Sequence, residues 1–456
     1  MDKVSIIMPL FNAERYLTEA LQSVLRQTYK EFELICVNDG STDNTEYIIT
    51  DFQSKDDRIK IITNKERLGA GPSRNKGLKE AKGEYVIFLD GDDVFEEELL
   101  EKTCIAMKRH RADIVLFEAL HVSSEMIYIK KIINRSESFI RNYCESVFSV
   151  NDFELIEFPN RSNAPWNKLF LKSFLEANQL EFQDLPSSND VYFANMALIC
   201  AKRIICLDDG RVMVYVRDHF EPSRISNDRD PMCAYYAMEK LAVELSNRNM
   251  FGRFADFYYG VLAFDMLYLL RKEKDEARKK SFYCFLRNEG IAKCIQYGKE
   301  TYNEVDSYYQ YVLESIRNNI YESETSTAQD TYFQYYLKKN GQAVLTFINE
   351  KLKKGRKIVL WGIGINGQVF LDYLDEHIIR IFAAVDMDIE KQGSIISGYR
   401  ILKPGDILQV ADVIITTSKQ TLWEIKDRIG CSRIEQVNLL ELLKRRCEEA
   451  IYNSAQ

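Results

Sequence analysis

The N-terminal part of the chain alternates apolar, β-branched runs with segments of helical periodicity, and this alternation constrains the fold most. The runs are VSIIMPLF (4–11), FELICVND (32–39), RIKIITN (58–64) and EYVIFLDGDD (84–93). Between them apolar residues recur at helical spacing, as Leu17, Leu21 and Val24 do. Strand–helix–strand alternation at this spacing predicts an α/β fold with a doubly wound, mostly parallel sheet. Such sheets bind ligands beyond the carboxyl ends of their strands.

The fourth run ends in three carboxylates, Asp90, Asp92 and Asp93. Carboxylates gathered at one strand end repel one another unless a cation or hydrogen-bond donors neutralise them. Mg²⁺ and Mn²⁺ prefer oxygen ligands and often bridge one or two carboxylates to substrate phosphates. The alternative is a turn followed by a helix cap, because Asp suits both positions.

Two further strand ends favour a nucleotide site. Asp39 ends the second run, where it accepts from a nucleobase N–H or, alternatively, serves as a helix cap or in a turn. Arg74 opens a helix after the glycine-containing LGAGPS stretch, where helix N–H groups and a guanidinium can hold phosphate oxygens. Each signal is weak alone, but together with the acidic strand end they predict a nucleotide-plus-metal site.

The order of several segments resembles the signatures of family 2 glycosyltransferases with the GT-A fold. These segments are VSIIMPLFNAERYL, VNDGSTDNT, NKERLGAGPSRNKG and YVIFLDGDD. Residues 164–198, with a Trp-x-Lys-Leu stretch, resemble the acceptor-side half of the same family, and residues 214–227 resemble its closing segment. The resemblance covers about residues 1–220 and implies inverting transfer of a sugar from a nucleotide donor.

The resemblance also implies roles for individual residues. Asp39 would accept from the uracil N3–H, and Asp90 would face the ribose or a metal-bound water. Asp92 would bind the metal across the diphosphate, with His219 either a further ligand or a surface histidine. The nucleotide-binding residues implied in this way are Pro9, Phe11, Asp39, Asn64, Arg74 and Asp90.

The general base implied by the resemblance is Asp190, which would take the proton from the acceptor hydroxyl. The residue before it is Asn189, where the family commonly has Glu, so one negative charge is missing beside the base. A like-charged neighbour raises the pKa of a carboxyl, and its absence favours a lower pKa. The alternative role for Asp190 is a helix cap.

The rest of the chain divides into a helical region and a second α/β segment. Residues 228–340 show helical spacing with a single proline, Pro231. Then RKIVLWGIGINGQVFLDYL (356–374) places a GxGxxG pattern between a strand and a helix, with Asp386 after the next strand. This fits the dinucleotide fingerprint, and it resembles small Rossmann-like domains appended to surface-polysaccharide enzymes. The candidate second nucleotide site, for NAD(P) or another nucleotide, is Gly362, Gly364, Gly367 and Asp386; a structural or oligomerising role is the alternative.

We therefore expect three regions in the 456 residues: a GT-A domain over 1–227, a helical region over 228–340 and a Rossmann-like domain over 341–456. The net charge of −8 disfavours broad nucleic-acid binding. No apolar run is long enough for a membrane span, and the 10 cysteines show no CxxC pair. These features predict a cytoplasmic protein, with peripheral membrane contact and homo-oligomers left open.

The function expected from the sequence is metal-dependent, inverting transfer from a nucleotide sugar, with UDP as the favoured nucleotide, to a saccharide or lipid-linked saccharide. The expected cofactor is Mn²⁺ or Mg²⁺. One alternative is a metal-dependent nucleotidyl transferase or nucleotide-sugar hydrolase. Another is a non-catalytic, dinucleotide-sensing scaffold protein. The intact DGDD segment and Asp190 argue against the scaffold.

Overall fold

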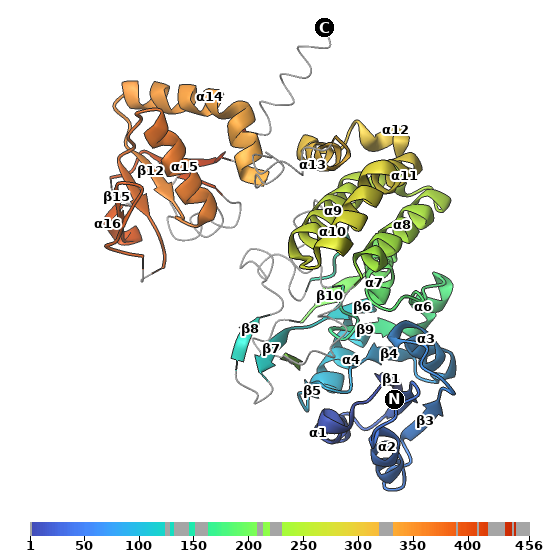
Figure 1. Ribbon diagram of the computed structural model, residues 1–456. Helices are drawn as coiled ribbons and strands as arrows, with labels where there is room; N and C mark the ends of the chain where they lie inside the picture. The colour runs from blue at the N-terminus through green and yellow to red at the C-terminus, as the bar shows by residue number, and fades with distance from the viewer. Residues whose placement is uncertain are drawn as a thin grey trace. The chain divides into compact units, whose positions relative to one another are not determined.

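A computed structural model of the chain separates it into two compact units, residues 1–319 and 320–456 (Figure 1). The structure describes residues 2–123, 128–131, 146–150, 163–207, 213–218, 230–318, 332–388, 391–407, 410–417, 434–439 and 442–443.

The first unit is built on a seven-stranded sheet in the order β10-β6-β9-β4-β1-β2-β3. Its four N-terminal strands run parallel, as the alternating pattern predicts. β1, β2 and β4 are mostly apolar and almost completely buried, as expected where helices cover both faces of a sheet. The strands are β1 (Val4–Leu10), β2 (Phe32–Asn38), β3 (Ile59–Thr63) and β4 (Tyr85–Phe88).

Helices lie on both faces of this sheet. Leu17 and Leu21 of α1, Ile49 of α2 and Leu99 of α4 share one apolar core with alternate residues of β1. On the other face, α3 packs against β1 and β2, and its Gly77 lies against Ile7. The predicted doubly wound architecture is therefore confirmed (Figure 1). The bounds are α1 (Glu14–Leu25), α2 (Thr45–Gln53), α3 (Ala70–Glu80) and α4 (Leu99–His110).

One strand of this sheet reverses direction, and the sequence pattern does not indicate it. β9 (Lys168–Leu171) pairs antiparallel with both β4 and β6 (Ile114–Leu116), while β10 (Ile204–Cys206) pairs parallel with β6. The helices α6 (Lys172–Ala177) and α7 (Asn189–Cys200) follow β9. A second sheet has the order β5-β11-β7-β8. Its strands are β5 (Val94–Phe95), β7 (Ala119–Ser123), β8 (Tyr128–Lys131) and β11 (Val214–Asp218).

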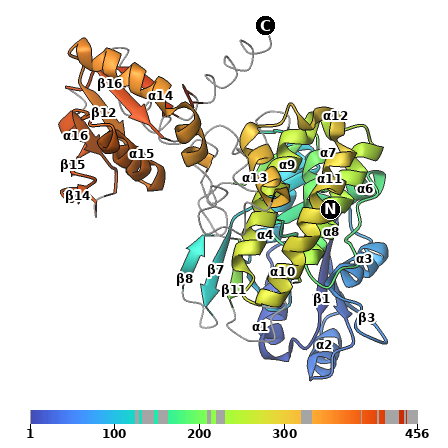
Figure 2. The same cartoon turned by 45° about the horizontal axis from the view of Figure 1, so that its top comes forward.

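The middle of the chain is helical, as predicted, and belongs to the first unit up to residue 319. Helix α8 packs against α7, and α9 packs against α8 and α13 (Figure 2). Tyrosines fill this helical layer: Tyr235, Tyr258 and Tyr308 are buried, in agreement with a packing role. The elements are α8 (Pro231–Asn247), α9 (Phe251–Lys272), α10 (Glu276–Phe285), the π-helix η2 (Leu286–Gly290), α11 (Ile291–Tyr297), α12 (Lys299–Tyr302) and α13 (Ser307–Arg317).

Helix α9 has non-helical backbone angles at Phe254, and the apolar residues 257–270 that follow this kink are mostly buried in the layer. In the described parts of the chain, every helix falls short of the length and apolar character that a bilayer crossing requires.

The second unit is a smaller α/β sheet in the order β14-β15-β13-β12-β16-β17. Five of its strands are parallel, and only β14 pairs antiparallel. The order of the parallel strands, with β12 in the middle and the chain winding outward to both sides, is that of doubly wound sheets that bind nucleotides. The elements are α14 (Tyr332–Lys353), β12 (Ile358–Trp361), α15 (Ile365–Glu376), β13 (Ala383–Val385), β14 (Ile395–Ile396), β15 (Tyr399–Leu402), α16 (Pro404–Ile407), β16 (Val413–Thr416) and β17 (Glu435–Asn438).

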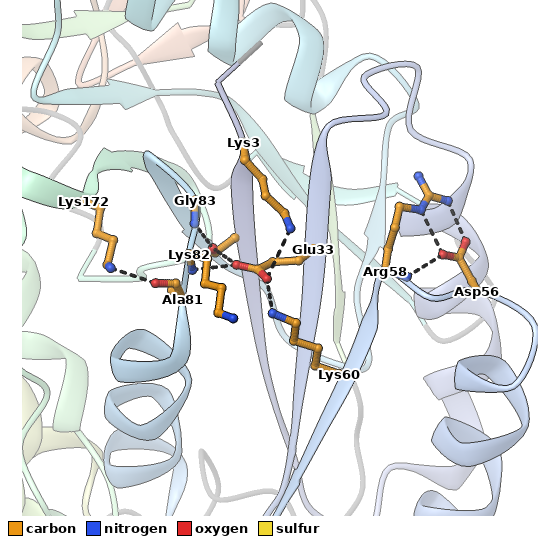
Figure 3. A network of polar contacts seen from close by, with 10 residues as sticks. Lys3, Glu33, Asp56, Arg58, Lys60, Ala81, Lys82, Gly83 and Lys172 are labelled. Atoms are coloured by element: carbon orange, nitrogen blue, oxygen red, sulfur yellow. Dashed lines mark hydrogen bonds and ion pairs between the residues drawn. The ribbon is translucent and has the colours of Figure 1, made fainter.

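A buried carboxylate organises the amino-terminal edge of the first sheet (Figure 3). Glu33 of β2 is 1% exposed and accepts from the hydroxyl of Ser5 and the backbone N–H of Lys82, both at 2.7 Å. The ammonium groups of Lys60 and Lys3 lie 2.5 and 3.5 Å from its Oε2. Burial raises the pKa of Glu33, but these donors and charges outweigh burial and lower it to about 2. The network lies at the opposite end of the strands from the carboxyl edge, and its role is structural.

Candidate functional site

The carboxyl ends of β1, β2, β3 and β4 lie at one edge of the first sheet because these strands are parallel. The polar residues predicted from the strand ends therefore share this edge. Asp39 follows β2 and Asn64 follows β3, and Asn64 Nδ2 donates to Asp39 Oδ1 at 2.7 Å. Asn64 also accepts from Lys76 Nζ at 2.6 Å. The tertiary structure thus joins two predicted site residues into one network.

The carboxylate of Asp39 is buried and bound by the loop that begins α3. Besides Asn64, its Oδ1 accepts from the N–H of Leu68 at 2.9 Å, and its Oδ2 accepts from the N–H of Gly69 at 2.8 Å. Gly69 is the residue before α3 and has a φ of 99°, which favours glycine. Asp39 therefore positions the turn through which the chain enters α3. A cap on the helix that follows β2 would require hydrogen bonds from the first turn of α2, whereas the backbone donors to Asp39 lie before α3.

Two apolar residues lie beside this network. Phe11 follows β1 and is 37% exposed, and the guanidinium of Arg67 lies 4.0 Å from the centre of its ring. Pro9 is the penultimate residue of β1, pairs with Val37 and is partly exposed. An accessible ring beside a buried carboxylate is a suitable arrangement for stacking a planar base.

Arg74 connects three segments that are far apart in the sequence. It is in the first half of α3, and its side chain is 8% exposed. One terminal nitrogen donates to Asp90 Oδ1 at 2.8 Å, and the other donates to Asn189 Oδ1 at 3.2 Å. Its buried Nε has no hydrogen-bond partner in the described part of the chain. The guanidinium thus fixes the acidic strand end against the start of α7.

This contact also explains the residue that precedes Asp190. The amide oxygen of Asn189 receives the Arg74 hydrogen bond, and its nitrogen donates to the carbonyl of Leu185 at 3.3 Å. Asn189, at the position where the family commonly has Glu, is therefore bound within this network and does not point into solvent. Asp190 follows it in the first turn of α7 and is partly exposed, where the positive end of the helix dipole favours a carboxylate.

The three aspartates of the DGDD segment differ in their surroundings. Asp90 pairs with Arg74, while Asp93 is buried and accepts from the backbone N–H of Arg217 at 3.0 Å. Asp92 is partly exposed between them. Among the described residues no three His, Cys, Asp or Glu side chains converge on a metal position. His219, the other predicted ligand, lies outside the described residues.

The donor set at this edge fits a hard divalent cation held mainly by a substrate. Mg²⁺ keeps several waters and is bound through one or two carboxylates together with substrate phosphates. Asp90 and Asp92 are both partly exposed, and Asp90 already pairs with Arg74. A cage made of protein ligands alone is not required for this chemistry.

Two cations near the site were not predicted. Arg217, the arginine of the closing segment, is buried; it donates to Glu19 Oε2 at 2.6 Å and lies over the ring of Tyr16. Lys168 of β9 is fully buried, and burial lowers its pKa to about 7 while the charge of Asp190 acts in the opposite direction. The Trp-x-Lys-Leu stretch contains Lys168, but nothing in that pattern indicates that the lysine is buried.

The glycines of the second unit lie where the chain passes from β12 into α15. Gly362 has a φ of 89°, and a Cβ on Gly367 would lie 2.3 Å from the carbonyl oxygen of Gly362. Gly364 precedes α15, and the space that its Cβ would occupy is open. A phosphate could approach the backbone there.

The acid of that fingerprint is already bound to the loop. Asp386 is buried and accepts from the N–H of Ile363 at 2.7 Å and from the N–H of Asp388 at 2.8 Å. Lys391 Nζ lies 3.4 Å from the same carboxylate. A ribose would have to share Asp386 with these donors. In the structure, the carboxylate holds the loop in place.

Two family models match separate regions of the chain. The family model described as "Glycosyl transferase family 2" matches residues 5–172, and the model described as "C2185-like, N-terminal" matches residues 354–438. The chain is 30% identical over 219 residues to the glycosyltransferase GlyG of Streptococcus pneumoniae, covering 45% of this chain and 68% of that protein. It is 45% identical over 98 residues to the Escherichia coli enzyme WfgD, named as a UDP-Glc:α-D-GlcNAc-diphosphoundecaprenol β-1,3-glucosyltransferase, covering 22% and 38%.

A solved structure is similar over about two thirds of the chain. It is the crystal structure of residues 1–349 of TarS from Staphylococcus aureus in complex with UDP. The TM-score is 0.55 at 25% identity, covering 69% of this chain and 87% of that chain. TarS is named as a poly(ribitol-phosphate) β-N-acetylglucosaminyltransferase. The chain spans between 31% and 68% of the length of GlyA, GlyG and TarS, three curated relatives that it matches.

Proposed function

This chain belongs to glycosyltransferase family 2, and on that premise we propose that it transfers a sugar from a UDP-sugar to an acceptor hydroxyl, with inversion at the anomeric carbon. The product would be part of a surface polysaccharide or glycolipid. The likeness to TarS bound to UDP supports a uridine nucleotide, and the donor named for WfgD is also a UDP-sugar.

The observation that carries the proposal is the position of Arg74. Its guanidinium donates to Asp90 on the donor side and to Asn189 directly before Asp190. A nucleotide held at the strand ends and a base at the start of α7 would therefore belong to one site. Fixed positions of both reactants are what accelerate a transfer reaction between two bound molecules.

On this proposal the strand ends bind the nucleotide. Phe11 and Pro9 contact the base, and Asp39 accepts from the uracil N3–H with the lone pairs not used by Asn64, Leu68 and Gly69. The remaining contacts to the base and ribose come from Asn64, Arg74 and Asp90. Since Asp39 is held by three donors, its carboxylate is oriented before the nucleotide arrives.

A divalent cation would be held by Asp92, with His219 as a further ligand, and by the diphosphate of the donor. When bound, it stabilises the negative charge of the leaving diphosphate as a Lewis acid. Arg74 adds positive charge at the same edge.

Asp190 acts as the general base in this proposal. Its carboxylate accepts the proton of the acceptor hydroxyl while that oxygen attacks the anomeric carbon from the face opposite the nucleotide. The C–O bond to the sugar forms as the bond to the diphosphate breaks, and UDP leaves with the electron pair. One displacement of this kind inverts the anomeric centre.

The acceptor class follows from the named relatives. WfgD is named for a lipid diphosphate saccharide and TarS for a poly(ribitol-phosphate) chain. We therefore propose a saccharide or lipid-linked saccharide acceptor for this chain. An enzyme with such substrates would work in the cytoplasm, in peripheral contact with the inner face of the membrane.

The test is release of UDP from a panel of UDP-sugars with Mn²⁺ and candidate acceptors, followed by analysis of the product. We expect the wild-type protein to release UDP with one donor, and both Asp92→Ala and Asp190→Asn to lose at least about hundredfold in kcat. A matched control is Asp51→Asn, because Asp51 pairs with Lys55 on the surface of α2. We expect this control to retain full activity.

The chemical identity of the product distinguishes sugar transfer from nucleotidyl transfer and from hydrolysis. A sugar linked to the acceptor supports transfer, whereas phosphate on the acceptor indicates nucleotidyl transfer and free sugar alone indicates hydrolysis. Unchanged turnover in both variants would refute the assignment of the site. No turnover with any donor would favour the scaffold protein.

A further inference from the structure

Lys168 lies at the edge of the sheet that carries the proposed site. It is the first residue of β9, which runs antiparallel to β4 with Leu169 opposite Ile87. The start of β9 therefore lies beside the end of β4, two residues before Asp90. This placement results from the reversed strand and depends on no local sequence signal.

The packing of β9 against α7 brings together the two elements that carry Lys168 and Asp190. The rings of Phe170 and Phe193 are 5.5 Å apart, so these two elements are in contact. Lys168 and Phe170 are two residues apart on a strand and point to the same face. Asp190 and Phe193 are three residues apart on a helix and also share a face. The two charged residues therefore lie next to the aromatic contact, one on each element.

The Lys168 ammonium is fully buried and makes hydrogen bonds to neutral acceptors. Its Nζ donates to the carbonyl of Ala164 and to Asn167 Oδ1, both at 2.7 Å. A buried charge is costly unless an opposite charge compensates it. Burial lowers the pKa of Lys168 to about 7, and Asp190 is the charged group of the described residues that raises it. Lys168 is therefore charged below neutral pH, where a carboxylate base is titrated.

Other charged groups lie on the elements packed against β9 and α7. They are Arg74 on α3, Asp90 after β4, Glu118 after β6, Glu176 on α6, and Lys240, Glu244 and Arg248 on α8. Arg74 is bound to Asp90 and Asn189, and Lys240 to Glu244, which also pairs with Arg248. Glu176 pairs with Lys172. Among the described residues, Asp190 on α7 is the charge that raises the pKa of Lys168 against the effect of burial.

We propose that Lys168 is a positioning residue for Asp190: its buried ammonium holds the carboxylate in place at the start of α7 and favours the ionised form. The inference rests on the proposed function, in which Asp190 is the base. Arg74 holds the neighbouring Asn189, so two cations fix the first turn of α7 from two elements. Such support keeps a catalytic group within a narrow range of positions.

The test compares Lys168→Gln with Lys168→Arg by the pH dependence of kcat/KM from about pH 4 to 8. Glutamine still donates a hydrogen bond but has no charge, so we expect kcat to fall about tenfold or more near pH 6. The acid limb should move upward by about one pH unit because the carboxyl becomes easier to protonate. The KM for the UDP-sugar should change less than twofold. Arginine retains the charge, and its acid limb should stay near the wild-type position.

Controls distinguish this inference from the proposed function. Lys172→Gln removes a charge four residues away, where Nζ donates to the carbonyl of Ala81, and should leave the acid limb unchanged. The variant Lys168→Gln/Asp190→Asn should be no slower than Asp190→Asn alone. Thermal melting and UDP binding verify that each variant is folded, and Lys168→Met provides a second uncharged variant if the glutamine variant is not.

Each outcome has one meaning. An acid limb that stays in place in both uncharged variants, with a reduced rate, overturns the positioning role and leaves the proposed function intact. Full activity of Asp190→Asn instead overturns the base assignment itself. The inference is supported if the acid limb moves upward in the uncharged variants and stays near the wild-type position in Lys168→Arg.

Discussion

The two ends of strand β2 each hold a buried carboxylate, but the partners differ in kind. Glu33, near the start of the strand, is paired with the ammonium groups of Lys60 and Lys3 and with two further donors (Figure 3). Asp39, directly after the strand, is held by an amide and by two backbone N–H groups of the loop before α3. One carboxylate is thus neutralised by cations, and the other is only oriented by neutral donors.

This difference separates stability from function. An ion pair with its hydrogen bonds completed stabilises the amino edge of the sheet and leaves little capacity for a ligand. A carboxylate held by neutral donors retains its charge and further lone pairs for a substrate N–H. Asp386 of the second unit combines the two arrangements, since it accepts from two backbone N–H groups and also pairs with the ammonium of Lys391. The following predictions test whether the comparison holds.

The largest effect is expected at Arg74, which links the carboxyl edge to α7. Arg74→Met removes the donors to Asp90 and Asn189, and we expect kcat/KM for the UDP-sugar to fall at least about hundredfold, or about 2.7 kcal/mol. The control is Arg58→Met, whose guanidinium pairs with Asp56 near the other edge (Figure 3). A loss of less than threefold at Arg74 would show that the carboxyl edge is not the site.

The next effect concerns stability at Glu33. Glu33→Gln removes a buried charged acceptor, and we expect urea unfolding at pH 7 to show a loss of about 2 kcal/mol, with activity per folded molecule unchanged. Lys60→Met, which leaves Lys3 in place, should cost less. Reduced activity at full stability would contradict the separation of the two edges.

The same glutamate predicts a pH dependence of stability. Its pKa in the folded protein is lowered to about 2 from an ordinary value of 4.5, so the folded state favours the ionised form. The stabilisation is therefore complete above about pH 5 and is lost as the pH falls toward 2. Glu33→Gln should lack this part of the acid destabilisation in urea titrations between pH 3 and 7. Parallel curves for the two proteins would argue against the network.

A smaller effect is expected at the other end of β2. Asp39→Asn keeps one acceptor oxygen but turns an amide NH₂ toward backbone donors, so we expect UDP to bind about tenfold more weakly in calorimetry. The control is Asp43→Asn in a neighbouring turn, where the carboxylate accepts from Glu14 N–H. Unchanged affinity in Asp39→Asn would mean that Asp39 serves only the loop.

The smallest effect is expected in the second unit. A thermal-shift screen with NAD and NADP should detect stabilisation of about 1.4 kcal/mol at ten times Kd if the loop of the second unit binds one of them. Gly364→Val should abolish the shift, because its side chain would occupy the open space at the start of α15. The absence of any shift would favour the structural role left open by the sequence.

Much of the fold followed from local patterns. The runs 4–11, 32–39 and 58–64 became parallel strands within a residue or two, because apolar β-branched runs of that length have few other stable environments. β9 was missed, since KLFL is too short to show a period and its partners lie more than 50 residues away. The role of Asn189 was equally inaccessible, because its partner Arg74 lies 115 residues earlier.

The sequence by itself determined the α/β class, the edge at which polar groups collect and the resemblance to family 2 glycosyltransferases. These depend on local periodicity and on residues that follow strands directly. Only the tertiary structure decided which carboxylates are paired, that Arg74 joins Asp90 to Asn189, and that Lys168 is buried where the charge of Asp190 opposes the effect of burial on its pKa. Charge–charge interactions depend on distance and burial, and both are set by contacts between segments far apart in the chain.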